Sequence, residues 1–123
     1  MISMVIGVIA SLLIAVGTVT TVASPMVLLD APAVILVVAM ALFSTLGVSG
    51  KLSGPALVRH FGHAAVRAGW IGFLIGVVLT LTMADPSSPD FAQYLMRAGA
   101  VAVLTPLYGY GLDFLTRIIA PQN

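Results

Sequence analysis

Four long apolar runs divide the chain, and a short polar segment separates each run from the next. The runs cover about residues 2–22, 33–48, 68–83 and 95–119. A helix needs about 20 apolar residues to cross a bilayer, and fewer where the bilayer thins or flanking side chains reach the interface. We therefore expect an all-α integral membrane protein, a single domain over residues 1–123 with four transmembrane helices.

The polar segments between the runs carry turn residues. "SPMVLLDAP" and "ADPSSPD" combine prolines with acids, so the helices should form two hairpins joined by the middle segment. In that segment Gly54-Pro55 resembles a helix start, and Arg59, His63 and Arg67 recur at i, i+4 and i+8 on one face. This pattern predicts a short cytoplasmic amphipathic helix between spans two and three, or an extension of span three towards acidic headgroups.

The composition agrees with a membrane protein. Hydrophobic residues make up 60% of the chain and charged residues only 7%, too few to cover a water-soluble domain. A net charge of +1 gives no electrostatic case for nucleic acid. No nucleophile–base pair, phosphate-binding loop or dinucleotide fingerprint occurs, so we expect neither an enzyme nor a cofactor. His60 and His63 have no third ligand nearby, and we expect no metal site.

The charged residues predict an orientation. The middle segment holds Lys51 and two arginines, and Arg117 lies near the C-terminus, whereas three of the four acids fall in the other two turns. Because basic residues mark the cytoplasmic side, both termini should be cytoplasmic in a multi-pass protein of the bacterial inner membrane. No Lys or Arg precedes the first run, which is also too long for the core of a signal peptide, so we expect a retained span.

The fourth run contains the chain's one acid within a span. Asp113 is costly in hydrocarbon and is therefore a candidate for an ion path, but Arg117 at i+4 shares its face and favours an ion pair near the membrane surface. Pro106 frees the carbonyl of Ala102, which predicts a kink with consequences either for packing or for gating. Thr105 can bond to such a carbonyl or line a polar path.

Small residues predict where the helices meet. Glycine lets two helix backbones approach closely, and a GxxxG spacing places two glycines on one face. In the third run this spacing occurs within "GWIGFLIG", and the fourth run carries two further glycines. We expect a helix–helix contact formed by Gly69, Gly72, Gly76, Gly109 and Gly111.

Two blocks of sequence resemble the MotA/TolQ/ExbB family of ion-driven motor proteins. "ASPMVLLDAPAVILVVAMALFSTLG", residues 23–47, is similar to the MotA pattern D-x-P-[SA]-x-x-x-V, here Asp30 to Val37. "GWIGFLIGVV" and "AVAVLTPLYGYGLD" are similar to the family's motifs in its third and fourth spans, and the matching positions are Gly69, Ile71, Gly72, Gly76, Tyr108 and Gly109. The resemblance implies four helices per subunit, a homo-oligomeric ring (a pentamer in characterised members) and a central single-span partner like MotB, TolR or ExbD. That partner would carry the ion-binding carboxylate.

The chain also departs from the family pattern. Phe73 and Pro106 stand where the family has threonines, and Val66 stands where it has a proline. The long cytoplasmic segment that transmits torque in MotA is reduced here to about twenty residues. A component that conducts protons would therefore depend on the remaining polar residues of the spans, with Thr105, Thr80, Thr82 and Asp113 as its ion-path candidates.

Two further hypotheses compete with the ring that packs around partner helices and conducts protons. A non-conducting homo-oligomeric scaffold would use the same helix packing, and Phe73 and Pro106 favour it. A small drug/proton exchanger would need an acid near the membrane midplane; Asp113 is expected too close to the cytoplasmic edge, and the chain has no Glu.

Overall fold

Four helices make up the described part of the chain. The computed structural model describes residues 2–20 and 29–121, and within these ranges it contains no strand, so the expected all-α class is confirmed. The end expected for the first span at residue 22, and most of the turn that follows it, lie outside the described residues. The helices are α1 (Ile2–Thr20), α2 (Ala31–Leu46), α3 (Pro55–Met83) and α4 (Phe91–Ile119).

Prolines and a glycine set the helix starts. Pro32 lies in the first turn of α2, and α3 starts at Pro55 directly after Gly54, whose φ of 55° is a conformation that glycine adopts without strain. From Pro55 the helix continues without a break to Met83, because no further proline interrupts it. A separate amphipathic helix before span three is therefore wrong, and the alternative, an extension of span three, describes the structure.

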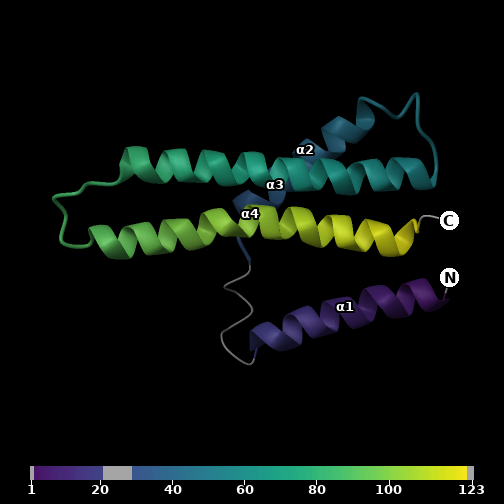
Figure 1. Ribbon diagram of the computed structural model, residues 1–123, viewed down its shortest axis with the longest axis horizontal. Coiled ribbons are helices and arrows are strands. Elements are labelled where there is room, and N and C mark those ends of the chain that lie inside the picture. Colours follow the sequence, from purple (N-terminus) through teal and green to yellow (C-terminus); the bar gives the residue numbers. More distant parts are fainter. Residues whose placement is uncertain (1, 21–28, 122–123) are drawn as a thin grey trace.

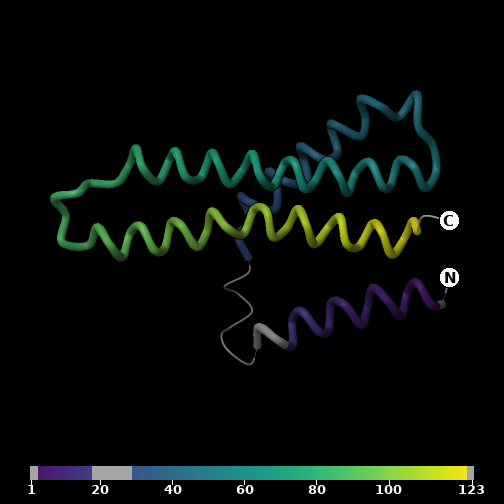
Figure 2. The backbone as a smooth tube through the Cα atoms, viewed as in Figure 1, coloured from purple at the N-terminus to yellow at the C-terminus, as the bar shows by residue number. Residues whose placement is uncertain are grey.

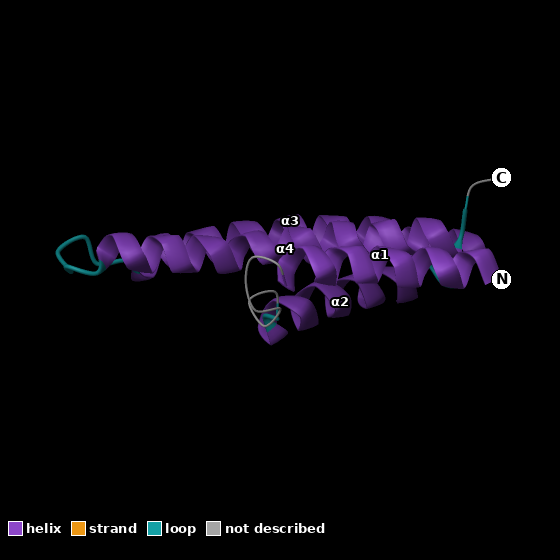
Figure 3. Ribbon diagram, turned by 90° about the horizontal axis from the view of Figure 1, so that it is seen from below, coloured by secondary structure: helices purple, strands orange, loops and turns teal. Residues whose placement is uncertain are grey.

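The two longest helices form an antiparallel hairpin. α3 and α4 have 29 residues each and run side by side over their length (Figure 1). α2 crosses the far face of this hairpin and packs mainly on α3, while α1 lies along the C-terminal half of α4, so the start of α1 and the end of α4 lie close to the same end of the hairpin (Figures 1 and 2). The turn between α3 and α4 extends well beyond α1 and α2 (Figure 3). The opposite face of the hairpin, which is turned to the viewer in Figure 1 and is called the near face below, is covered by no described helix.

Small side chains, rather than large ones, form the centre of the fold. Val37 and Ala41 of α2 pack against three alanines of α3, Ala64, Ala65 and Ala68, which are all buried. Large apolar side chains point outwards instead, among them Leu13, Phe43 and Leu81, each about two-thirds exposed or more. This distribution is the opposite of that in a water-soluble domain, and exposed apolar surface of this extent marks contact with lipid or with other chains.

Length and composition separate the helices into two groups. Among the described residues, α3 and α4 are long and apolar enough to cross a membrane, whereas α1 and α2 are shorter apolar helices. The third expected span, 68–83, corresponds to the second half of α3. The second expected span, 33–48, corresponds to α2, which begins and ends two residues earlier. The fourth, 95–119, begins one turn earlier, at Phe91.

Candidate functional site

Glycines set the closest approach of α3 and α4. A Cβ added to Gly69 would lie 2.7 Å from the carbonyl oxygen of Thr105, and one added to Gly109 would lie 2.5 Å from that of Ala65. Gly72 and Gly76 face α4 at slightly greater distance. Because a carbonyl oxygen of the facing backbone occupies the space, only glycine fits at the two closest positions.

Two other glycines differ from the sequence-based expectation. Gly111 does not belong to this contact, since a Cβ added there meets no atom within 4 Å. It is only two residues after Gly109, and a step of two rotates it about 200° around the helix, away from α3. Gly62, which the sequence analysis did not single out, does belong: a Cβ there would lie 2.9 Å from Oδ1 of Asp113.

The proline of α4 is compensated by the residue before it. Pro106 lies within a continuous helix and has no N–H for the Ala102 carbonyl. The Thr105 hydroxyl donates to that carbonyl at 2.9 Å, and Thr105 is buried. Of the two roles open to Thr105, the structure thus shows the one that satisfies the backbone.

The other candidate threonines also bond to their own helix. Thr80 donates to the Gly76 carbonyl at 2.7 Å, and Thr82 donates to the Leu79 carbonyl at 3.0 Å. Thr80 and Thr105 line the same groove between α2, α3 and α4, whereas Thr82 is exposed and does not line it. The structure therefore brings together two of the three threonines.

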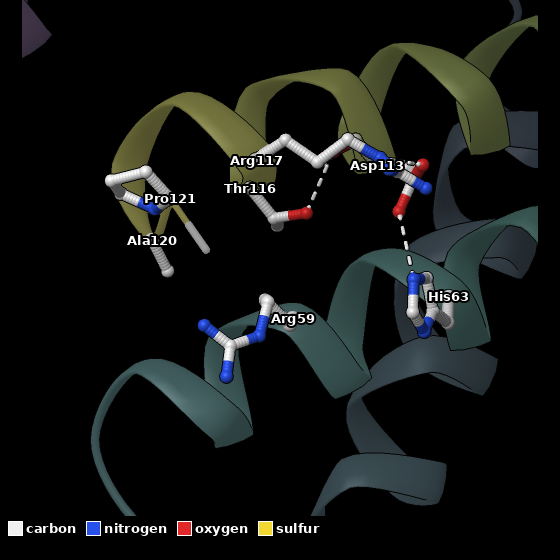
Figure 4. Close-up of a pocket in the computed structure, with 7 residues that line it drawn as sticks. All are labelled: Arg59, His63, Asp113, Thr116, Arg117, Ala120 and Pro121. Carbon is white, nitrogen blue, oxygen red and sulfur yellow. Dashed lines mark hydrogen bonds and ion pairs between the residues drawn. The ribbon is translucent and has the colours of Figure 1, made fainter. Parts of the chain in front are cut away.

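Asp113 lies in a polar cluster between the ends of α3 and α4. Its Oδ2 accepts a hydrogen bond from Nε of Arg117 at 2.7 Å, so the ion pair expected from the i, i+4 spacing is present (Figure 4). Its Oδ1 is buried without a hydrogen-bond partner in the structure and faces Nε2 of His63 at 3.9 Å. Thr116 donates to the Asp113 carbonyl at 2.8 Å. The carboxylate thus joins the two helices of the hairpin.

The three basic residues expected on one face of α3 do not all lie in one place. Arg59 and His63 line a pocket with α4, but Arg67 does not. Eight residues exceed two helical turns by about 80°, which rotates Arg67 away from Arg59. His60 lies 3.3 Å from the Ser44 hydroxyl of α2, so the two histidines face different partners. Among the described residues, no group of three or more metal-ligating side chains forms a metal site.

The helix α1 gives the position of Asp113 along the hairpin. Gly7 of α1 faces Ile118 of α4, and the two helices run in opposite directions (Figure 1). Asp113, five residues before Ile118, therefore lies at about the level of Leu12, near the middle of the uncharged helix α1. Asp113 thus lies near the end of α4 but level with the middle of α1.

Two aromatic contacts were not found from the sequence. The backbone N–H of Asp30 donates to the Tyr108 hydroxyl at 3.0 Å and so ties the start of α2 to α4. The indole N–H of Trp70 donates to the Tyr110 hydroxyl at 3.3 Å, between α3 and α4. No pattern in the sequence could have paired these residues, although an aromatic residue with a polar group in an apolar run commonly has such a partner.

Comparison with known proteins identifies no relative. No protein family, curated protein or solved structure shows a significant match to this chain. The class of protein is therefore defined by the sequence and structure of the chain itself. The described residues form helices, and two of these are long and apolar enough to cross a membrane.

Proposed function

We propose that the protein is a membrane subunit that crosses the bacterial inner membrane four times, with both termini in the cytoplasm. The lengths of α3 and α4 and the outward-pointing apolar side chains support the membrane location. The charges agree with the orientation: Arg59 and Arg117 lie towards the end of the hairpin where α3 begins and α4 ends, and Asp85 and Asp90 lie at the other end, where Arg97 is the exception.

The subunit assembles, in this proposal, as a MotA/TolQ/ExbB-like homo-oligomeric ring around single-span partner helices. The observation that carries it is the uncovered near face of the α3–α4 hairpin. On this face Trp70, Phe73 and Val77 recur at helical spacing along α3, with Val103 and Tyr110 on α4. The peripheral α1 and α2 leave this face free for neighbouring subunits and the central partner, as the resemblance in the sequence implies.

Cysteine cross-linking tests the ring directly, because the chain has no cysteine of its own. Val103→Cys places a thiol on the uncovered face, and Leu13→Cys places one on the outer helix α1 as a matched control; both side chains are exposed. In native membranes we expect oxidised Val103→Cys protein to form dimers or adducts with a single-span protein, whereas Leu13→Cys protein stays monomeric. Equal cross-linking of both variants, or none of either, would contradict the arrangement.

Whether the ring conducts protons or serves as a scaffold depends on the hairpin interior. Thr105 and Thr80 line one groove and supply the polar lining that a proton path needs. Their hydroxyl protons, however, are directed to backbone carbonyls of their own helix. Phe73 contributes no polar atom. The direction of these hydroxyl protons and the apolar Phe73 support a second candidate function, a non-conducting scaffold.

Proton flux in liposomes separates the two candidates. Conduction through the hairpin predicts a flux that Thr105→Val abolishes and Thr105→Ser retains, because serine keeps the hydroxyl. A scaffold predicts no flux above that of protein-free liposomes for any of the three proteins. A flux that Thr105→Val leaves unchanged would remove Thr105 from the path.

A further inference from the structure

One arginine in the polar cluster, Arg59, has no counter-ion among the residues that the structure describes. Arg59 extends from α3 into the space beneath the last turn of α4, near Thr116, Ala120 and Pro121 (Figure 4). Within the part of the chain that the structure describes, it takes part in no hydrogen bond or ion pair. We propose that Arg59 binds the phosphate of an anionic lipid headgroup in this pocket.

Asp113, the one acid among the described residues that line the pocket, is already paired. Oδ2 of Asp113 is paired with Arg117, and the buried Oδ1 faces His63 rather than Arg59. The pocket therefore has a net charge of about +1 with a neutral imidazole and +2 with a protonated one. The free carbonyls at the end of α4 repel an anion, but α3 begins at the same end, and its N-terminal dipole offsets this effect.

The surroundings of the pocket make an unpaired arginine costly. The pocket lies between α3 and the last turns of α4, and charged side chains of membrane-spanning helices pair with an opposite charge or reach out to the interface. Its volume of about 270 Å³ holds a phosphate group and several waters, at roughly 30 Å³ for each water. Basic pockets between transmembrane helices on the cytoplasmic side bind acidic lipid headgroups. A phosphate would supply the negative charge that Arg59 does not find among the described residues.

This inference rests on the proposal that α3 and α4 cross a bilayer, and the test separates the two. If the expressed protein leaves the membrane fraction after an alkaline carbonate wash, the proposed function fails. If it stays in that fraction, native mass spectrometry of the detergent-purified protein counts bound lipids one at a time. Phosphatidylglycerol is the anionic probe and phosphatidylcholine the zwitterionic control.

We expect the wild-type protein to bind phosphatidylglycerol in preference to phosphatidylcholine. Arg59→Gln should weaken this binding about tenfold, the effect of one charge-assisted hydrogen bond. Arg67→Gln removes the same charge two turns along α3 but outside the pocket, and should bind as the wild type does. Pro121→Glu adds an acid at the exposed rim of the pocket, beyond the end of α4, and should also weaken binding.

Several results would overturn the inference: equal affinity for the two lipids, wild-type affinity in folded Arg59→Gln or Pro121→Glu protein, or equal losses in the Arg59 and Arg67 variants. Competition with inorganic phosphate then identifies the source of the phosphate. Displacement of the lipid by millimolar phosphate indicates a site that recognises the phosphate group alone. Retention of the lipid indicates a headgroup site to which the acyl chains contribute.

Discussion

Replacing Gly109 by alanine tests the closest contact between a described glycine and the backbone of a neighbouring helix. The added Cβ would lie 2.5 Å from the carbonyl oxygen of Ala65 and 3.0 Å from Cα of Val66, whereas ordinary contacts begin at 3.4 Å. Both atoms belong to the α3 backbone, so no side chain can rotate to make room. The two helices must move apart, and they lose packing over neighbouring turns.

The control for this change lies two residues further along the same helix. Gly111→Ala adds the same methyl group where no atom lies within 4 Å. Both variants gain the same helix propensity, about 1 kcal/mol, so the difference between them isolates the steric cost. Overpacking of a well-packed contact costs about 1–3 kcal/mol, and we expect Gly109→Ala to be less stable than Gly111→Ala by that amount.

Reversible unfolding of the two variants in mixed detergent micelles, followed by circular dichroism at increasing SDS fractions, gives this difference. Gly111→Ala should unfold at the same SDS fraction as the wild type or a higher one, and Gly109→Ala at a lower one. If Gly109→Ala is as stable as Gly111→Ala, the backbones of α3 and α4 are not in contact at this glycine, and the packing described above is wrong.

Other contacts give predictions of the same kind. Tyr108→Phe removes the acceptor of the N–H at the start of α2 and should lower the unfolding free energy by about 0.5–1.5 kcal/mol in the same assay. Arg117→Gln leaves the Asp113 carboxylate without its close partner and should cost about 1–2 kcal/mol, reduced because Arg117 is itself largely exposed; a neutral result would contradict this role. Hydrogen bonds from the Ser87 side chain, and then from its backbone, lower the pKa of Asp85 below 3.8, so this stabilisation is present above that value and is lost as the pH falls through the lowered pKa. Ser87→Ala should raise the pKa of Asp85 in a carboxyl NMR titration.

Local features of the sequence were enough to predict the all-α class and some of the contacts within single helices. Proline and glycine act on the backbone next to them, which is why Gly54-Pro55 marks the start of α3 and Thr105 bonds to the carbonyl that Pro106 frees. The pair of Asp113 with Arg117 follows in the same way from the geometry of a single helix. In each case the interacting groups lie within one turn of each other.

Contacts between helices depend on the register of one helix along another and on its rotation about its own axis. Local sequence patterns predict neither the register nor the rotation. The glycines of α3 were predicted to form a contact, but not which turn of α4 each would face, and Gly111 was assigned to the wrong side. The same limit applies to Tyr108 and the start of α2. Only the hairpin register brings these groups together.

The polar cluster shows why this register matters for function. In the sequence, Asp113 has one partner, four residues away, and is expected near the membrane surface. In the fold, Gly62 lets the backbone of α3 approach the carboxylate, His63 faces its second oxygen, and α1 covers the same level of the hairpin. A larger residue at position 62 would displace Asp113 and Thr116 from α3. Because glycine has no side chain, α3 can approach Asp113 and Thr116 at this position, and the pocket beside Arg59 therefore depends on Gly62 as well as on its charged residues.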